Sequence, residues 1–586
     1  MIVRLHRQWP VLLLWLLASA LLVWFSWDTV LTRAGWDPDD QLRLVQLRDF
    51  LGGQSWFDTT QYRLNPPDGA PMHWSRLVEL PLAAIVLLLT PLLGSAGAEM
   101  AAGIAVPLLC LGGITYLLAG IAETIGGRGA GIAAAIVTLV SPGLLLQLQP
   151  MRIDHHGWQI FCAVLALATL FWTDKRKAGL VMGAALSVWL HISLEGAPMT
   201  AAFFLILGWR WVVERGEGVR LFWTLCGFVM LSLALFFGTQ ANGFAAQQYC
   251  DTISPAHIWA ILAAAVLILP AILAKPSQRW LRIGAVALAG FAAIGVLFWL
   301  APACTQGAFG DLDPVVRTFW YANVTEGLPV WHQDPLVVLT LLPPLAVASV
   351  SLCMAFRFGD AAHRQMLFQL GFFLVYASIL SLLVFRTVSV ATAFTVVPTA
   401  LCLAATARRY RVEPAFLRRM GLVGIGLILL IPGQIVTSMV PAAGSSSRAV
   451  ANGEVARKTA QEKCESLSSL QALSRLPIGN IVAPFDLGPA ILLTTKHKVL
   501  ASSHHRNRQG MRDQIDILRL SPDLARPIMM RHNIRYLVAC PGEAELNNYS
   551  RKTPAGLWAQ IEKGRTPDWL DYQGTIGNGL QVWRVR

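Results

Sequence analysis

Three short acidic segments of this sequence carry side chains that could do chemistry. They are Asp37-Pro38-Asp39-Asp40, Asp154-His155-His156 and Asn323-Val324-Thr325-Glu326. Carboxylate oxygens and imidazole nitrogens bind divalent cations, and a bound Mn²⁺ or Mg²⁺ would neutralise a phosphate-bearing leaving group. The segments therefore predict a divalent-cation site that works with a catalytic carboxylate.

Each segment also has a plainer interpretation. The aspartates at 37–40 precede a helical pattern of apolar residues and could cap that helix in solvent. Asp154-His155-His156 could be a polar turn between two apolar runs. Zinc is the weaker alternative there, because adjacent histidines on an extended turn point apart and the sequence shows no Cys₂ or HExxH partner.

Arg386 is the other candidate, because it lies between two apolar runs. A charged group at that position usually has a partner or lines a polar cavity, although its long side chain could also extend to the membrane interface. Arginine suits bidentate contact with phosphate, so Arg386 is a candidate phosphate ligand.

The composition shows what must position these groups. Of the 586 residues, 55% are hydrophobic and 14% charged, and the mean hydropathy is +0.53. A typical globular chain has roughly a quarter of charged residues. The values exclude an ordinary soluble enzyme and a disordered chain, and they indicate a polytopic membrane protein. The net charge of +13 is then first a signal of topology, and no nucleic-acid partner is expected.

Thirteen apolar runs are long enough to be membrane spans. They lie near 11–27, 98–121, 128–148, 157–173, 178–192, 196–212, 221–239, 257–274, 283–301, 335–355, 366–385, 388–406 and 419–438. A further run, 79–95, is broken by Pro81 and Pro91 and is interpreted as re-entrant or lying on the membrane surface.

Basic residues predict which loops face the cytoplasm. With thirteen spans and a cytoplasmic N-terminus, five basic loops fall on the cytoplasmic side, as the positive-inside rule requires. These loops are 174–177, 210–220, 275–282, 357–364 and 408–419. The acidic segments then fall in external loops 32–97, 149–156 and 302–334, and the C-terminus is extracytoplasmic.

The composition changes near residue 441. Residues 441–586 combine a helical pattern at 454–473 with short β-rich runs at 491–494, 499–502 and 534–539. We therefore expect an all-α polytopic membrane protein of about thirteen transmembrane helices over residues 1–440, followed by a soluble extracytoplasmic α/β domain.

Taken together, the segments resemble the GT-C membrane glycosyltransferases, and within them the catalytic subunit of oligosaccharyltransferase. Asp37 to Arg43 matches a D-x-x-x-x-x-R motif that opens a helix. Asn65-Pro66-Pro67-Asp68-Gly69 with His73-Trp74-Ser75-Arg76 resembles a Y-P-x-G…H-x-x-P/R segment.

Three further segments match in order and side of the membrane. Asp154-His155-His156 stands where the family has D-x-D or D-N-E. Asn323 to Pro329 resembles S-V-S-E-x-x-P, and Arg386 with Val397-Pro398 resembles an R-F…V-P run.

The resemblance implies roles for these residues. Asp37 would position or deprotonate the acceptor, with Asp39 or Asp40 as close alternatives, and Glu326 would support catalysis. The predicted metal ligands are Asp37, Asp154, His155 and Glu326, and the predicted substrate-binding residues are Arg386, His73 and Arg76.

One departure concerns the acceptor. The family's W-W-D-Y-G motif, which recognises the Ser/Thr of a protein acceptor, is reduced to Phe485-Asp486-Leu487-Gly488. A basic cluster nearby, Ser503-His504-His505-Arg506-Asn507-Arg508, could contact lipid phosphates or be a solvated face. The departure favours a glycolipid or polysaccharide acceptor over a protein.

The predicted function is transfer of a sugar or oligosaccharide from a polyprenyl-(pyro)phosphate donor to an extracytoplasmic acceptor, in a bacterial-type inner membrane. The alternatives are a sugar-lipid transporter and a metal-independent surface-polysaccharide ligase or polymerase. Outside the cytoplasm, Cys250 with Cys304 and Cys464 with Cys540 could form disulfides, although the sequence gives no distances.

Overall fold

The computed structural model describes residues 8–32, 37–310, 312–439 and 463–586. It is mostly helical, at 73%. The chain divides into two compact units, which are considered separately below. The helical unit comprises Met1–Val30, Ser75–Gly310 and Thr325–Val440, and the α/β unit comprises Leu31–Trp74, Asp311–Val324 and Pro441–Arg586. The sequence-based boundary near residue 440 is therefore one of several points where the chain passes between units.

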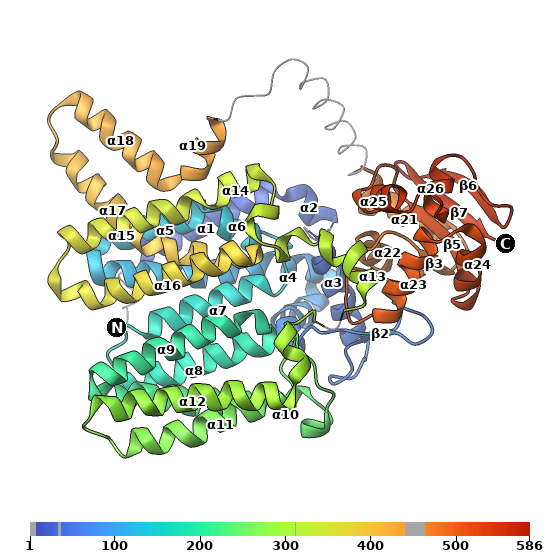
Figure 1. Cartoon of the computed structure of the whole chain (residues 1–586). Coiled ribbons are helices and arrows are strands. Elements are labelled where there is room, and N and C mark those ends of the chain that lie inside the picture. The colour runs from blue at the N-terminus through green and yellow to red at the C-terminus, as the bar shows by residue number, and fades with distance from the viewer. Residues whose placement is uncertain (1–7, 33–36, 311, 440–462) are drawn as a thin grey trace. The chain divides into compact units, whose positions relative to one another are not determined.

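The helical unit is built from long apolar helices, many of which lie side by side (Figure 1). Its helices are α1 (Trp9–Phe25), α4 (Glu79–Gly126), α5 (Arg128–Val140), α6 (Pro142–Leu148), α7 (His156–Thr169), α8 (Lys175–Ile192), α9 (Ala197–Val213), α10 (Gly218–Thr239), α11 (Pro255–Leu273), α12 (Arg279–Leu300), α14 (Pro335–Leu341), α15 (Pro343–Phe358), α16 (Arg364–Leu383), α17 (Val388–Val412), α18 (Phe416–Leu430) and α19 (Pro432–Ser438), while α2 (Trp27–Thr32) crosses the first boundary.

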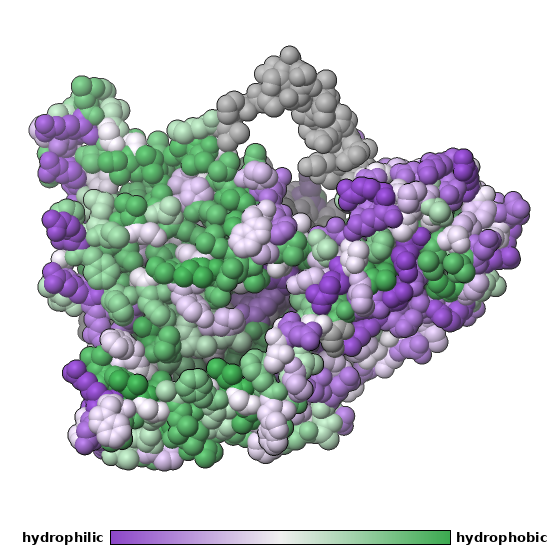
Figure 2. Space-filling model, in the orientation of Figure 1, coloured by the Kyte–Doolittle hydropathy of each residue, from purple (hydrophilic) through white to green (hydrophobic). Residues whose placement is uncertain are grey.

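Eight helical segments of the described chain are long and apolar enough to cross a membrane, or up to ten if two bent pairs each count as one span. The bent pairs are α5 with α6, at 65°, and α18 with α19, at 99°. The surface of this unit is mainly hydrophobic, with hydrophilic patches gathered at the helix tips on the left of Figure 2. A polytopic membrane protein is therefore supported, while the count of thirteen spans stays a prediction.

The run 79–95 is helical, but it is set apart from the span that follows it. Gly94 interrupts α4 with φ 69° and ψ 167°, a conformation that favours glycine. Before the break, Leu87, Leu88 and Leu92 are exposed while Val86 is buried. The segment therefore has one apolar face open to its surroundings.

α17 is the central helix of this unit, because it packs against α4, α5, α7, α15 and α16. All of its residues from Val388 to Ala400 are buried. Small residues also allow close helix contacts elsewhere. A Cβ at Gly183 of α8 would lie 2.2 Å from the carbonyl oxygen of Thr224 in α10, so only glycine fits there.

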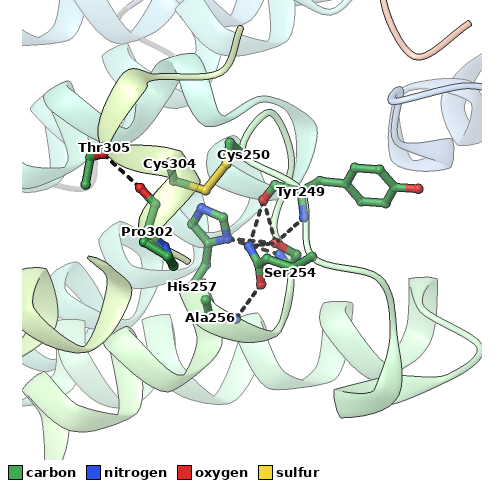
Figure 3. Close-up of a disulfide and its surroundings, with 9 residues drawn as sticks. Tyr249, Cys250, Ser254, Ala256, His257, Pro302, Cys304 and Thr305 are labelled. Atoms are coloured by element: carbon green, nitrogen blue, oxygen red, sulfur yellow. Dashed lines mark hydrogen bonds between the residues drawn. A yellow bond between two sulfur atoms is a disulfide. The ribbon is translucent and has the colours of Figure 1, made fainter. Parts of the chain in front are cut away.

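A disulfide joins Cys250 and Cys304 in the helical unit (Figure 3). Beside it, the Ser254 hydroxyl donates to the Tyr249 carbonyl (2.8 Å), and the Ser254 N–H donates to Nδ1 of His257 (3.3 Å). In the α/β unit, Cys464 is bonded to Cys540. Both pairs considered from the sequence are thus disulfides in the structure.

The α/β unit is built on a five-stranded mixed sheet of order β4-β3-β5-β7-β6. Strands β4, β3 and β5 are parallel, and β5, β7 and β6 are antiparallel. The strands are β3 (Asn480–Val482), β4 (Lys498–Val499), β5 (Ile534–Ala539), β6 (Leu570–Ile576) and β7 (Leu580–Val585). The helices of the C-terminal segment are α21 (Leu467–Gln471), α22 (Leu487–Thr494), α23 (Arg508–Arg519), α24 (Pro522–Arg531), α25 (Ala544–Lys552) and α26 (Leu557–Glu562).

The predicted strands had mixed outcomes. The run 534–539 is strand β5, as predicted. Of the run 499–502, only Val499 belongs to a strand, β4. The prediction of a strand at 491–494 is wrong, because these residues belong to α22. A short apolar run cannot be assigned to helix or strand by periodicity alone. Of the predicted helical pattern at 454–473, residues 454–462 lie outside the described residues. The part from residue 463 contains α21.

Two segments distant in sequence complete the α/β unit. One contains α3 (Pro38–Leu51) and the strand pair β1 (Thr60–Gln61) and β2 (Ala70–Pro71), and the other contains α13 (Pro314–Phe319). The Arg48 guanidinium of α3 donates to the Leu493 carbonyl (3.1 Å). Asp313 pairs with Arg512 of α23 at 2.9 Å. Part of two predicted external loops, 32–97 and 302–334, therefore folds with the C-terminal segment.

Candidate functional site

Asp154, His155 and His156 form a compact cluster where α7 begins. One carboxylate oxygen of Asp154 lies 2.5 Å from Nδ1 of His155 and the other 3.4 Å from Nε2 of His156. The two imidazole rings are 4.3 Å apart. The expectation that these histidines point apart is therefore wrong. His155 has helical dihedrals as the residue before α7, so the turn is not extended.

The charge environment favours an ionised Asp154. Burial acts to raise its pKa, but the charges of His155 and His156 outweigh this effect and hold the pKa well below its usual value. Burial also lowers the pKa of the neighbouring Arg152, while the negative charges of Asp154 and Glu326 act in the opposite direction. Glu326 is thus within electrostatic range of this cluster.

Gln159 connects the cluster to a second carboxylate. Its amide nitrogen lies 3.4 Å from Nδ1 of His156 and donates to Oε2 of Glu195 (3.0 Å). Its carbonyl oxygen accepts a hydrogen bond from the Trp189 indole N–H (3.0 Å). Because Gln159 is one turn into α7, the helix presents it on the same side as His156.

Arg386 lies on the 3₁₀ turn Phe385–Thr387 between α16 and α17. Its guanidinium pairs with Glu195 at 2.5 Å and with Glu326 at 3.3 Å. The backbone holds the two loops together, because the Phe385 N–H donates to the Leu328 carbonyl (3.2 Å). Arg386 therefore has acidic partners, as expected of a charge at the end of a membrane span.

The sequence-based prediction missed Glu195. A signal for it was present, because Glu195-Gly196-Ala197-Pro198 has the same E-G-x-P form as Glu326-Gly327-Leu328-Pro329. Both glutamates pair with Arg386 in the structure.

Asp37 and Asp40 lie in the α/β unit, at the start of α3. Oδ1 of Asp37 accepts hydrogen bonds from the backbone N–H groups of Asp39 (2.9 Å) and Asp40 (3.1 Å). The Asp40 carboxylate in turn accepts from the Asp37 N–H (3.3 Å), which completes a capping box. The helix cap is confirmed, although Asp40 is buried and not in solvent, and a catalytic role for Asp37 stays a prediction.

The predicted substrate-binding residues are in different surroundings. His73 lies in the α/β unit with its ring 4.7 Å from that of His505. Arg76 belongs to the helical unit and forms a buried ion pair with Glu79 at 2.7 Å. That pair lies at the start of α4, so Arg76 already takes part in a structural contact.

Within the helical unit, the structure thus brings together four of the predicted residues: Asp154, His155, Glu326 and Arg386. It adds His156, Gln159 and Glu195 to them. Asp37, Asp40 and His73 belong to the α/β unit.

No protein-family profile matches the sequence, and no curated protein matches it. Solved structures do match. The archaeal oligosaccharyltransferase AglB from Archaeoglobus fulgidus, in complex with an inhibitory peptide and a dolichol-phosphate, superposes with a TM-score of 0.64 at 14% identity, covering 98% of this chain and 74% of that one.

Two other structures of the Archaeoglobus fulgidus oligosaccharyltransferase also match, each at 14% identity. The apo form has a TM-score of 0.61 and covers 97% of this chain and 74% of that one. A complex with Zn and sulfate has a TM-score of 0.57 and covers 96% of this chain and 72% of that one. The chain therefore has the GT-C fold of the oligosaccharyltransferases, as its sequence motifs implied.

Proposed function

We propose that this protein is a GT-C-type membrane glycosyltransferase that transfers a sugar or oligosaccharide from a polyprenyl-(pyro)phosphate donor to an extracytoplasmic acceptor. The proposal rests on the ion pair of Arg386 with Glu326, which lies in the same unit as the Asp154 cluster. This unit is part of a chain with a GT-C fold. An AglB structure of the same fold holds a dolichol-phosphate, which is a polyprenyl phosphate.

The Asp154 cluster fits a divalent cation. Asp154, His155 and His156 each offer a ligand atom, and these atoms lie within 4.8 Å of one another. One carboxylate and two imidazoles suit Mn²⁺ or Zn²⁺ better than Mg²⁺, which prefers oxygen ligands. The resemblance adds Glu326 and Asp37 as candidate ligands. When bound, such an ion would supply positive charge for a departing phosphate.

Two side chains of the protein would bind the donor and activate the acceptor. Arg386 would bind the phosphate of the donor through its guanidinium, which can donate two parallel hydrogen bonds. Asp37 would orient the acceptor group or take its proton, with Asp40 as the alternative. The capping bonds that both aspartates form would hold the Asp37 carboxylate in a fixed orientation.

The membrane arrangement belongs to the same proposal. Thirteen spans would place the external loops and the C-terminal segment outside the cytoplasm of a bacterial-type inner membrane. Disulfides persist in oxidising compartments, and all four bonded cysteines lie in segments predicted to be external. The five unpaired cysteines, by contrast, lie in predicted spans.

A glycolipid or polysaccharide acceptor is favoured over a protein. At the position of the family's W-W-D-Y-G motif, Phe485 is buried and its N–H donates to the Glu545 carboxylate (2.8 Å). The next residue, Asp486, accepts a hydrogen bond from the Ser503 hydroxyl (2.7 Å). This segment thus has no exposed tryptophan pair with which to hold a protein acceptor.

Sugar transfer in membranes that contain the full chain tests the proposal. Radiolabelled polyprenyl-phosphate sugars should lose label to an acceptor, and EDTA should stop the transfer. Transfer that survives EDTA would favour the metal-independent ligase or polymerase. Movement of the donor across the bilayer without its consumption would favour a transporter.

A further inference from the structure

Arg386 pairs with two glutamates that lie in the same short sequence motif. Glu195 and Glu326 each begin an E-G-x-P tetrapeptide, and each contacts a different nitrogen of the guanidinium. The contacts differ in length, at 2.5 Å for Glu195 and 3.3 Å for Glu326.

Glu195 is the better-held partner. Its side chain is 29% exposed, and its second oxygen accepts the hydrogen bond from Gln159. The turn that carries it is packed on Trp189, because a Cβ at Gly196 would lie 2.5 Å from the indole nitrogen. Trp189 also holds Gln159, so one indole fixes both ends of this hydrogen bond.

Glu326 is held less firmly. Its side chain is 55% exposed, while that of Arg386 is 17% exposed. Because water solvates the Glu326 carboxylate, its 3.3 Å ion pair with Arg386 contributes less free energy than a fully buried pair would. An incoming anion can therefore displace Glu326 from this Arg386 nitrogen with a small loss of interaction free energy.

We propose that the two glutamates have different tasks at one guanidinium. Glu195 is a positioning residue that orients Arg386 and links it through Gln159 to His156 of the Asp154 cluster. Glu326 contacts the Arg386 nitrogen that would bind phosphate, and the phosphate of an incoming lipid-linked donor displaces Glu326 from it. This inference rests on the proposed function in one respect, namely that Arg386 binds phosphate.

Simple electrostatics makes a competing prediction. Removing either negative charge raises the positive potential at Arg386, so both neutral variants would bind an anion more tightly. Positioning predicts opposite signs instead. Loss of Glu326 removes a competitor of the anion and should strengthen anion binding. Loss of Glu195 leaves the Arg386 guanidinium without its fixed orientation and should weaken anion binding.

The test is binding of inorganic pyrophosphate to the purified full chain in detergent, by calorimetry, with a chelator present so that metal binding does not contribute. Glu326→Gln should bind about two- to five-fold more tightly than the wild type, the range expected when a solvated carboxylate partner of Arg386 is removed. Glu195→Gln should bind about ten-fold more weakly, the size of a lost charge-assisted hydrogen bond. Glu214→Gln, which removes an exposed partner of Lys175, is the matched control and should not change binding.

Glu195→Asp separates position from charge. It keeps the negative charge but withdraws the carboxylate by one methylene, so positioning predicts weaker binding and electrostatics predicts no change. In the double variant, the gain from Glu326→Gln should disappear, because the freed position is useful only on an oriented guanidinium. Thermal unfolding of each variant checks that the fold is kept.

Binding by Glu195→Gln or Glu195→Asp at wild-type strength or tighter would overturn the inference and leave the proposed function standing. Absence of pyrophosphate binding by the wild type would instead overturn the role of Arg386 in the proposed function, and the inference with it.

Discussion

Two ionic clusters of the helical unit lie at the two ends of α9, and they are built in opposite ways. Past the C-terminal end of α9, Glu217 is 4% exposed and pairs with three cations. Lys175 and Arg210 each lie 2.8 Å away and Arg220 lies 3.2 Å away. Before the N-terminal end, Glu195 shares the guanidinium of Arg386 with a second acid, Glu326.

The cations around Glu217 are also bonded to helix ends. Arg220 donates to the carbonyls of Thr169 (2.6 Å) and Trp172 (2.7 Å), and Arg210 donates to the carbonyl of Leu170 (2.9 Å). These carbonyls lie at the C-terminal end of α7 and just beyond it, where helical N–H donors run out. The Glu217 cluster therefore joins α7, α8, α9 and α10 as a structural contact.

The Arg386 cluster is more exposed, and it pairs two acids with one guanidinium. An arrangement that a cation or an anion can enter and rearrange is expected of a binding site, not of a structural contact. The difference between the two clusters thus separates variants that should stop turnover from variants that should unfold the protein.

The largest expected effect is on turnover at the Asp154 cluster. Asp154→Asn should lower sugar transfer by about 100-fold or more, because it removes the carboxylate that both histidines contact. Metal-dependent transfer by purified protein measures this loss. The exposed Asp568 is the control, since Asp568→Asn should change neither transfer nor unfolding. Transfer by Asp154→Asn at the wild-type rate would assign this cluster to structure.

Asp37→Asn should also lower the rate, by about 10²- to 10⁴-fold, the usual contribution of a general base. Unfolding should be almost unaffected, because asparagine caps a helix about as well as aspartate does. Donor binding should be retained, which single-turnover measurements can separate from the rate. If Asp40→Asn is inactive while Asp37→Asn is active, Asp40 is the catalytic residue.

Glu217→Ala should have its effect on stability. It leaves three cations around a buried position without their acid, which should cost about 3–5 kcal/mol of unfolding free energy. Glu326→Gln should cost less than about 1 kcal/mol, because the Glu326 side chain is 55% exposed and solvated. Thermal or denaturant unfolding in detergent compares the two. Equal losses of stability would remove the distinction between the clusters.

A smaller effect of pH is expected from the α/β unit. Burial and the nearby charge of Asp486 raise the pKa of Glu545 to about 8, although hydrogen bonds from Phe485 and Tyr549 act in the opposite direction. The folded state therefore binds a proton that the unfolded state releases above its ordinary pKa of 4.5. Stability should fall as the pH rises from that value to about 8.

Glu545→Gln tests this dependence. The variant should raise the melting temperature at pH 8 and change it little at pH 4, since the wild-type side chain is already neutral there. An equal shift at both pH values would show that the carboxyl proton does not contribute.

The sequence predicted the membrane helices better than the details of the site. Apolar runs such as 257–274 and 366–385 are helices, because a helix satisfies every backbone polar group within its own segment. Shorter runs were ambiguous, and 491–494 was assigned to the wrong class. The count of spans depends on bends such as that between α18 and α19, which hydropathy alone does not reveal.

Asp154, His155, Glu326 and Arg386 could be identified because their local motifs resemble those of a family. Glu195 shares the E-G-x-P form of Glu326, but the sequence does not show its contact with Arg386, which is 191 residues away. The arrangement of the two histidines was also beyond the sequence, because it depends on where helix α7 begins.

Mass spectrometry of envelope glycolipids, polysaccharides and glycoproteins from a deletion strain tests the central claim most directly. We predict that one sugar-bearing species is lost and that a polyprenyl-linked sugar accumulates. The wild-type gene should restore the species, and the Asp154→Asn variant should not. An unchanged envelope in the deletion strain, or full restoration by Asp154→Asn, would contradict a glycosyltransferase that works through this site.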